Sequence, residues 1–330
     1  MPNFTVTISW LKLVRYKYKK VKVYNGFSSY SVVKNAVVTI GAFDGVHVGH
    51  QSIINRMLGI AQQHKGEAVL VTFDPHPRLV LQKDAKVKLL TSIKERINLL
   101  KKAGVDHLII IPFDKNFSNL TSLEFIRDIL VEKIGTKRLV IGYDHHFGRN
   151  REGSFDHLMK YGPIYGFDVE EIPPQEVNYI NVSSTKIRNA IQEGDVVKAA
   201  EYMGHPYTIG GLVIKGEQIG RSIGFPTANI KVEEVNKLIP KEGVYAVRVI
   251  HDNKKFSGML NIGYRPTVGR DNQLSIEVHI FDFQKNIYGR QITLEIIKHV
   301  RNEIQFTNVN DLKSQLERDL MESKNILKSA

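Results

Sequence analysis

The apolar run Ala36-Val-Val-Thr-Ile40 is followed directly by Gly41-Ala-Phe-Asp-Gly-Val-His-Val-Gly-His50. The run predicts a buried strand, and residues 50–64 have the apolar spacing of a helix. Between them, three glycines let the backbone approach a ligand closely and lead into a helix N-terminus, which attracts phosphate. The stretch lacks the lysine of a P-loop and the spacing of the dinucleotide fingerprint. It therefore predicts a phosphate-binding loop of another type, placed at the start of an α/β domain.

Strands and helices alternate through the rest of the first half of the chain. Ser92 and Thr121 each open a capping box, and Gly104 and Gly135 are suited to end the helices that follow. This alternation implies a Rossmann-like parallel sheet with helices on both faces, and ligands bind beyond the carboxyl ends of such strands. We therefore expect chemistry after the first, second and fourth strands. The predicted strands are 36–40, 68–72, 107–112, 138–141 and 167–172, and the predicted helices are 50–64, 92–103, 121–134 and 155–161.

The pattern changes after about residue 206, following a predicted helical connector over residues 187–205. Strand-like segments at 244–250, 255–261, 274–283 and 291–300 are separated by Gly, Asn and Asp turn signals. The next long helix is predicted only at 310–327. This arrangement predicts a small antiparallel β-barrel or sandwich with a C-terminal helix.

Composition limits the function classes. The 330 residues contain no cysteine, which excludes disulfides, thiolate nucleophiles and Cys-ligated metal sites and fits a cytoplasmic protein. No apolar run approaches the ~18 residues of a membrane span, so we expect no membrane association. The net charge of +12 favours an anionic partner. Residues 1–24 carry six Lys or Arg and no acid, and we prefer a basic tail or an over-extended start to a functional basic arm.

Two helix entrances carry the residues suited to phosphate chemistry. His47 and His50 lie three apart, so both can reach one anion and stabilise charge that develops on a phosphate. The competing interpretations are two surface histidines at a helix start, or a metal pair for which Asp44 is the one nearby candidate ligand. The segment Val182-Ser-Ser-Thr-Lys-Ile-Arg188 places hydroxyls and two cations at another helix start. Read alone, it is an ordinary N-cap.

A third segment, Gly216-Glu-Gln-Ile-Gly-Arg-Ser-Ile-Gly-Phe-Pro-Thr-Ala-Asn229, opens the β domain. Gly220 and Gly224 permit close backbone approach, and Arg221 can meet a phosphate. Thr227 and Asn229 offer oxygen ligands for magnesium. The alternative is a glycine-rich hairpin with a proline turn. Further along, Glu277 lies on the strand face opposite its apolar neighbours, where a solvated carboxylate is the ordinary interpretation.

Together these motifs resemble a known family. The stretch 41–50 with Ser183-Ser-Thr-Lys-Ile-Arg188 resembles the nucleotidyltransferases that attach AMP to a phosphorylated acceptor and release pyrophosphate. Thr72-Phe-Asp-Pro-His-Pro77 and Ile141-Gly-Tyr-Asp-His-His-Phe-Gly148 resemble the N-terminal module of prokaryotic bifunctional riboflavin kinase/FAD synthetases. The resemblance covers about residues 21 to 325. It implies that riboflavin and ATP give FMN, and that FMN and ATP then give FAD and pyrophosphate.

The resemblance implies roles for residues of the N-terminal module. His47 and His50 would act on the ATP phosphates. ATP would be held by Gly41, Phe43, Asp44, Gly49, Ser183, Ser184, Thr185 and Arg188, and the flavin by Asp144, Phe147 and Gly148. The chain departs from the family at His145, where an aromatic is usual, and at Ser154, where an acid is usual.

It also implies roles in the second module. Glu277 would be the general base that takes the proton of the ribityl 5′-hydroxyl. Thr227 and Asn229 would hold Mg²⁺ with ATP, and Arg301 would lie on the flavin and phosphate side. The remaining ATP contacts would come from Gly220, Arg221, Gly224 and Pro226.

The resulting prediction is a Rossmann-like nucleotidyltransferase domain (21–186) after a basic extension (1–20), followed by a riboflavin kinase barrel (187–330). Its partners would be riboflavin, FMN and ATP with Mg²⁺, and we expect a monomer or weak homo-oligomer that does not bind nucleic acid. One alternative is a riboflavin kinase whose adenylyltransferase module has decayed. Another is a flavin-sensing, nucleic-acid-binding regulator, which the basic charge would support.

Overall fold

The computed structural model describes residues 20–82, 87–173, 182–216, 219–265 and 273–329. Contacts group the chain into two compact units. The first comprises Met1–Ala42, Gln51–Ala85 and Ile97–Val177, and the second comprises Phe43–His50, Lys86–Arg96 and Asn178–Ala330. The predicted basic extension lies, up to residue 19, outside the described residues. The predicted domain division stays a prediction, because the compact units do not follow single boundaries in the sequence.

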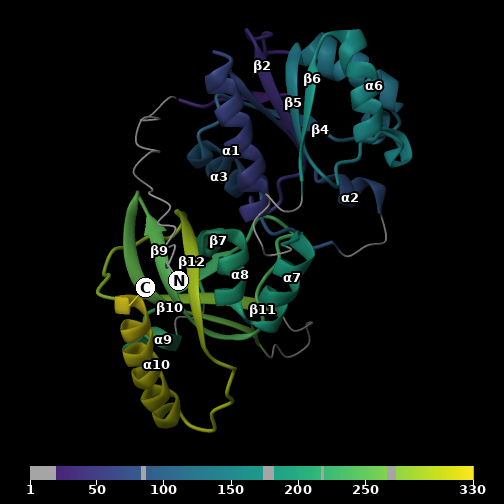
Figure 1. Cartoon of the computed structure of the whole chain (residues 1–330). Helices are drawn as coiled ribbons and strands as arrows, with labels where there is room; N and C mark the ends of the chain where they lie inside the picture. Colours follow the sequence, from purple (N-terminus) through teal and green to yellow (C-terminus); the bar gives the residue numbers. More distant parts are fainter. Residues whose placement is uncertain (1–19, 83–86, 174–181, 217–218, 266–272, 330) are drawn as a thin grey trace, which may run out of the picture. The chain divides into compact units, whose positions relative to one another are not determined.

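A parallel sheet of six strands forms the first unit, in the order β1-β4-β3-β2-β5-β6 (Figure 1). All neighbouring pairs run parallel. The strands are β1 (Lys22–Asn25), β2 (Ala36–Ile40), β3 (Ala68–Asp74), β4 (His107–Pro112), β5 (Thr136–Gly142) and β6 (Asp168–Ile172). The five predicted strands are confirmed. The edge strand β1 was missed, because its short sequence lies within the basic segment.

The strand order reverses at β2, with β3 on one side and β5 on the other. Ligands of open α/β sheets bind beyond the carboxyl ends of the strands at such a reversal. The loops that begin there contain Gly41, after β2, and Asp144, after β5. The sheet therefore places the two predicted substrate loops after the two strands that flank its switch point.

Helices cover the sheet, with α1 and α3 on one side of the strands and α6 on the other in Figure 1. Both capping boxes are present: Ser92 and Glu95 exchange hydrogen bonds of 3.2 and 2.8 Å, and Thr121 and Glu124 do the same. The second box opens a one-turn helix that continues as a π-helix. The helices are α1 (Val48–Gln63), α2 (Pro77–Leu81), α3 (Ile93–Ala103), α4 (Lys115–Ser118), α5 (Ser122–Glu124), the π-helix Phe125–Ile134, the 3-10 turn Arg149–Arg151 and α6 (Phe155–Tyr165).

A closed antiparallel barrel forms most of the second unit, in the order β10-β11-β8-β7-β12-β9. Along β11, Ile276, Val278 and Ile280 are buried in the barrel core, as their alternation predicts. The strands are β7 (Tyr207–Ile214), β8 (Ala228–Lys231), β9 (Gly243–His251), β10 (Lys254–Arg265), β11 (Gln273–Ile280) and β12 (Gln291–Arg301). A short helix α9 (Ile219–Ser222) precedes β8, and the long helix α10 (Val309–Ser329) ends the fold.

The predicted helical connector consists of two helices. Helix α7 (Ser184–Glu193) ends where Gly194 adopts a φ of +86°, and Asp195 caps α8 (Val196–Met203) by accepting a hydrogen bond from Lys198 N. The left-handed glycine ends the first helix, and the second begins two residues later. No helix in the described part of the chain is long and apolar enough to cross a membrane.

Candidate active sites

A tight turn joins β2 to α1, and we call its residues 43–50 the histidine loop. Phe43, Gly45 and Val46 all have positive φ values, of 47°, 82° and 42°. Two of the three carry a β-carbon, so this backbone is strained and needs contacts that hold it. The turn brings the His47 and His50 rings into a stack, with centroids 3.6 Å apart. Helix α1 begins between them and has no acidic residue in its first turn, so the positive end of the helix can attract an anion there.

His50 is held in its neutral form. Burial, and then the proximity of His47 and Arg96, lower the pKa of His50 well below 6.5. Its Nδ1 atom is buried and has no hydrogen-bond partner among the described residues. His50 can therefore act on a phosphate as a hydrogen-bond donor, while the stacked pair avoids carrying two positive charges.

Asp44 fixes the loop from within. Its side chain is 2 % exposed and accepts hydrogen bonds from Leu90 N (3.0 Å), Thr91 N (2.9 Å) and Thr91 Oγ1 (3.0 Å). Arg188 Nη2 completes the set at 2.6 Å. Gly45 N donates to the same threonine hydroxyl at 3.1 Å. Asp44 and Arg188, both predicted to hold ATP, are thus paired with each other, and direct contact with ATP stays a prediction.

Helix α7 meets the histidine loop at its N-terminus. Ser183 caps the helix by accepting from Lys186 N at 3.3 Å, and Ser184 Oγ donates to Asp44 O at 3.5 Å. Thr185 is exposed. The structure therefore brings the second predicted phosphate segment to the first through Ser184 and Arg188. Of the other predicted ATP residues, Gly49 is buried in the first turn of α1, and Gly41 lies in the first unit, where it donates to Val71 O.

The predicted flavin loop follows β5 in the first unit. Phe147 forms an antiparallel bridge with Gly153 and is buried, whereas Asp144 is exposed. The ring of His145 stacks on Phe147 at 5.9 Å and 26°. Burial lowers the pKa of His145 to about 4, so the imidazole is neutral and can stack as the family's usual aromatic would. Gly148 has a φ of +74°, and a β-carbon there would lie 2.9 Å from Ser122 N.

In the barrel, two hydroxyls position the Glu277 carboxylate. Thr227 Oγ1 donates to Glu277 Oε2 at 3.0 Å, and Ser275 Oγ donates to Glu277 Oε1 at 2.9 Å. Asn229 lies directly opposite Glu277 in the pairing of β8 with β11. Three of the predicted residues, from two segments 50 residues apart, thus converge at one point of the barrel.

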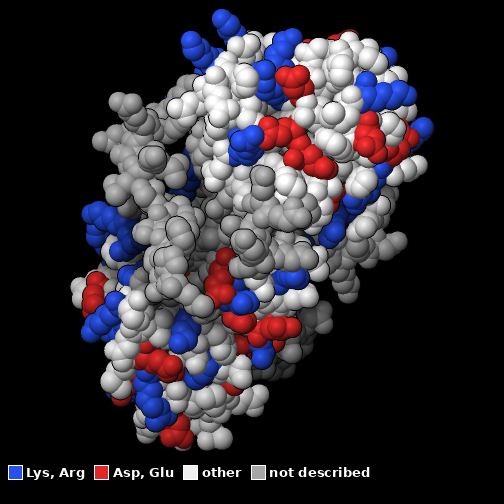
Figure 2. All heavy atoms as spheres, viewed as in Figure 1, with Lys and Arg blue, Asp and Glu red and all other residues white. Residues whose placement is uncertain are grey.

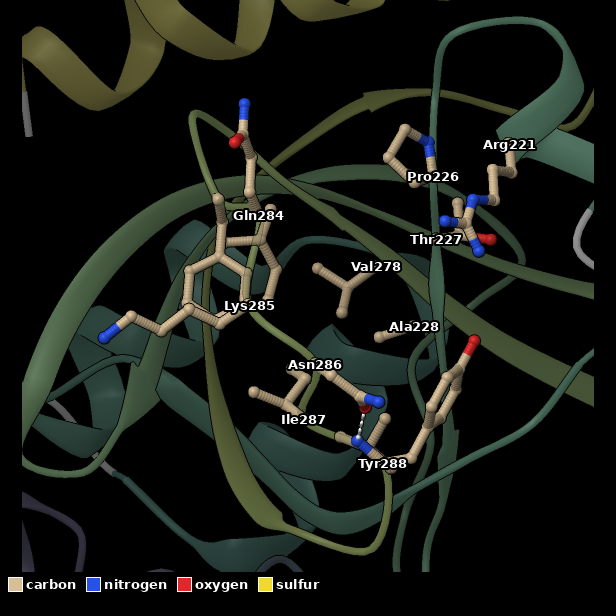
Figure 3. Close-up of a pocket in the computed structure, with 13 residues that line it drawn as sticks. Arg221, Pro226, Thr227, Ala228, Val278, Gln284, Lys285, Asn286, Ile287 and Tyr288 are labelled. Atoms are coloured by element: carbon tan, nitrogen blue, oxygen red, sulfur yellow. Dashed lines mark hydrogen bonds between the residues drawn. The ribbon is translucent and has the colours of Figure 1, made fainter.

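A cavity of about 430 Å³ opens beside Thr227 (Figure 3). Arg221, Pro226 and Thr227 lie together on one side of it, and Gln284 and Lys285 lie on another. Its remaining wall is largely apolar and is formed by Val213, Ala228, Val278, Ile280, Phe283, Asn286, Ile287 and Tyr288. A base-sized apolar space with a cation and a hydroxyl at one side suits a nucleotide.

The remaining predicted barrel residues shape this region or lie elsewhere. Gly220 is packed against Phe225 O, where a β-carbon would approach to 2.3 Å, and Gly224 has a φ of +89°. Arg301 makes a two-pronged ion pair with Asp319 of α10, at 2.7 Å for the closest atoms. Asp319 is 1 % exposed, so this contact anchors α10 on β12. The predicted flavin and phosphate role of Arg301 stays a prediction.

Comparison with known proteins identifies the family of both segments. The FAD synthetase family matches residues 30–186, and the Riboflavin kinase family matches residues 203–327. A bifunctional riboflavin kinase/FMN adenylyltransferase from Listeria monocytogenes is 40 % identical over 291 residues, which are 88 % of this chain and 92 % of that protein. This chain belongs to that bifunctional family.

A further relative has the same name, and a solved structure with a different description shares the fold. The protein of the same name from Escherichia coli K12 is 37 % identical over 87 % of this chain and 91 % of its own length. A solved structure described as a macrolide-efflux protein from Streptococcus pneumoniae has a TM-score of 0.82 and 30 % identity, and covers 92 % of this chain and 99 % of that one. We refer below to residues 30–186 as the FAD synthetase segment and to residues 203–327 as the riboflavin kinase segment.

Sequence reasoning missed several residues that shape these sites. Thr91 supports the histidine loop and Ser275 orients Glu277, yet neither lies in a recognisable motif. Residues 283–288 complete the cavity wall, and their loop-like composition gave no signal. Strand alternation does place Ser275 beside Glu277 on one face, because alternate residues of a strand share a face, but it gave Ser275 no role.

Proposed function

We propose that this chain phosphorylates riboflavin with ATP at the barrel and adenylylates the resulting FMN with a second ATP at the histidine loop. The observation that supports the first assignment best is the Glu277 carboxylate, held by two hydroxyls next to a nucleotide-sized cavity. The stacked histidines at a helix N-terminus without an acidic residue in its first turn support the second. The match to both family segments favours two activities over a chain that retains only the kinase.

In the kinase reaction, Glu277 would accept the proton of the riboflavin 5′-hydroxyl as that oxygen attacks the γ-phosphorus of ATP. The new O–P bond replaces the bond to ADP, which leaves with the electron pair. The base of ATP would occupy the apolar part of the cavity, with its phosphates toward Arg221 and Thr227. Thr227 borders the cavity and also bonds Glu277, so it links the donor and acceptor sides of the site.

Mg²⁺ fits the oxygen donors of this site. Thr227 and Asn229 would hold the ion with ATP, and the ion would supply charge neutralisation on the phosphates. Asn229 is 8 % exposed and packs over Gly216, where a β-carbon would lie only 2.1 Å from Asn229 Nδ2. The glycine thus leaves room for the amide. Among the described residues, no group of three or more His, Asp or Glu side chains could hold a metal by itself.

Adenylyl transfer does not require a nucleophile from the protein, because FMN already presents a phosphate oxygen that can attack. That oxygen would attack the α-phosphorus of ATP, and pyrophosphate would leave with the electrons of the broken P–O bond. His47, His50 and the N-terminus of α1 would donate to the phosphates while charge shifts toward pyrophosphate. Asp144, Phe147 and Gly148 would contribute to the flavin side from the loop after β5.

A nucleic-acid-binding role has less support. On the face shown in Figure 2, Lys and Arg side chains are interspersed with Asp and Glu rather than gathered in one patch. Binding of nucleic acid without sequence preference depends on a concentrated positive surface. The cytoplasmic location and the monomeric or weakly oligomeric state stay predictions from the sequence.

One incubation tests the proposal. The chain is mixed with riboflavin, ATP and Mg²⁺, and the flavins are separated by chromatography. We expect FMN to appear first and FAD to follow. His47→Ala should lower FAD formation by about 10²–10³-fold, the cost of losing one preorganised donor to a developing charge, while FMN accumulates at the wild-type rate. FAD formation by that variant at the wild-type rate would show that the histidine loop is not the adenylylation site.

A further inference from the structure

The histidine loop is part of the FAD synthetase segment, but residues of the riboflavin kinase segment hold it. Phe43–His50 and Lys86–Arg96 both belong to the compact unit that contains the barrel. Leu90, which bonds Asp44, is fully buried in the barrel's own core cluster. The conformation of the loop therefore depends on side chains that lie more than 100 residues later in the sequence.

Lys237 holds the segment 89–95, which in turn bonds the histidine loop. Its side chain is 2 % exposed, and its Nζ donates to Leu90 O and to Glu95 Oε2, both at 2.7 Å. The same ammonium lies 4.4 Å from the centre of the Tyr207 ring. The backbone around it pairs with the same segment, since Leu89 N donates to Asn236 O and Leu238 N donates to Leu89 O. A lysine is rarely buried to this extent without partners that fix it.

A continuous set of hydrogen bonds runs from Lys237 to the loop. Lys237 fixes the carbonyl of Leu90, and the N–H groups of Leu90 and Thr91 fix the Asp44 carboxylate. Glu95 anchors the other end, because its carboxylate accepts from Ser92 N at 2.8 Å and from Gly210 N of β7 at 2.9 Å. The segment 89–95 is therefore hydrogen-bonded both to residues of the riboflavin kinase segment and to the histidine loop.

His205 contacts the loop directly. Its Nε2 lies 3.0 Å from Gly45 O and its Nδ1 lies 3.0 Å from Pro206 O, so the tautomer with the proton on Nε2 donates to the loop backbone. Gly45 lies between the two residues with unfavourable positive φ values. His205 of the riboflavin kinase segment thus meets the loop where its backbone is most strained, while Lys237 supports the loop one step away, through Leu90.

We propose that Lys237 is a positioning residue for FMN adenylylation, and that through Leu90 and Asp44 it keeps the histidine loop in the conformation that presents His47 and His50. The inference rests on the proposed role of that loop. Lys237 has no part in the proposed kinase site, so riboflavin phosphorylation by the same chain serves as an internal control.

The test compares Lys237→Met with Lys94→Met in the full-length chain. Lys94 is a matched control, because it pairs with Glu233 at 3.1 Å between the same two segments but is 77 % exposed. For Lys237→Met we expect the kcat of FAD formation from FMN to fall by about 10- to 100-fold, as for a catalytic group displaced by ~1 Å. We expect its KM for FMN and its riboflavin kinase rate to stay within about twofold of wild type. Lys94→Met should match wild type in all three.

Two further measurements separate positioning from general destabilisation. If Lys237 acts through Asp44, adding Lys237→Met to Asp44→Asn should reduce FAD formation by much less than the product of the two single effects. Lys237→Gln, a milder change, is used in the same assays if the methionine variant is poorly folded. An equal loss of both activities, additive effects, or FAD formation like that of Lys94→Met would each overturn the proposal. Unaffected FAD formation in His47→Ala would instead refute the site assignment on which it rests.

Discussion

Replacing Glu277 with glutamine separates the charge of this side chain from its shape. Each carboxylate oxygen accepts one hydroxyl hydrogen bond, from Thr227 or from Ser275. Glutamine keeps the length and one carbonyl acceptor, and its amide can donate to a hydroxyl that turns to accept. The side chain is only partly buried. We therefore expect the free energy of unfolding to change by less than ~1 kcal/mol.

The loss of activity should be much larger. An amide cannot take the proton of the 5′-hydroxyl, and a positioned general base contributes about 10²–10⁴-fold to a rate. The kcat for riboflavin phosphorylation should fall by that factor, which corresponds to ~3–5 kcal/mol in activation free energy. Glu277→Asp keeps the negative charge, but its side chain is one methylene shorter, so the carboxylate lies farther from the Thr227 and Ser275 hydroxyls. Since a displacement of ~1 Å can cost about 10²-fold, the aspartate variant should retain more activity than glutamine but far less than wild type.

The assay follows FMN formation from riboflavin, ATP and Mg²⁺ by chromatography, with urea unfolding measured on the same preparations. FAD formation from supplied FMN is the control, because that reaction does not use Glu277. Riboflavin phosphorylation by Glu277→Gln within about tenfold of wild type would refute the general-base role. A parallel loss of FAD formation would mean that the substitution disturbs the fold and not the proton transfer.

Three other predictions concern packing and pH. Gly216→Ala would push a methyl group against the Asn229 amide. We therefore expect the rate of FMN formation to fall by about tenfold or more, with FAD formation unchanged. Equal rates of FMN formation in the variant and wild type would contradict the packing argument. Asp319→Ala leaves the Arg301 guanidinium without its buried partner, which should lower the free energy of unfolding by ~3–5 kcal/mol in urea titrations; a loss under ~1 kcal/mol would argue against the anchoring of α10. Burial lowers the pKa of His145 to about 4. Between pH ~6.5 and about pH 4, this histidine is therefore protonated in the unfolded chain but neutral in the folded chain. The free energy of unfolding should fall by up to ~1.4 kcal/mol per pH unit as the pH is lowered through this range. His145→Phe should flatten this slope, and an unchanged slope between pH ~7 and ~5 would show that the imidazole is not protected.

Local signals predicted much of the fold. The capping boxes at Ser92 and Thr121 and the helix-ending Gly104 and Gly135 depend on residues within one or two turns, so they could be identified without tertiary structure. Strand β7 was missed because it contains adjacent glycines, which disfavour strands. In the barrel, Gly211 is needed, since a β-carbon there would lie 2.8 Å from Lys231 O on β8.

The candidate sites likewise combine residues that the sequence predicted with contacts that only the structure shows. The loop around His47 suggested phosphate binding from its residue types and spacing, whereas Thr227 and Glu277 were given their predicted roles by the family resemblance. That Asp44 is bonded to Arg188 and Thr91 instead of lying open to a ligand could not be foreseen. Arg188 lies 144 residues from Asp44 in the sequence, and Thr91 lies 47 residues away. A carboxylate in a glycine-rich loop is suited to ligand contact and to internal pairing equally well.

The sequence by itself indicated, through the family resemblance of its motifs, the two reactions and the order of the modules, and it predicted which residues are suited to hold phosphates. Only the tertiary structure decided what holds those residues in place. Lys237 has no motif around it and would pass for a solvated surface charge, yet it is buried against Glu95 and Leu90 beneath the histidine loop. Burial and pairing arise from the folding of distant segments into one compact unit, and no pattern within any single segment encodes them.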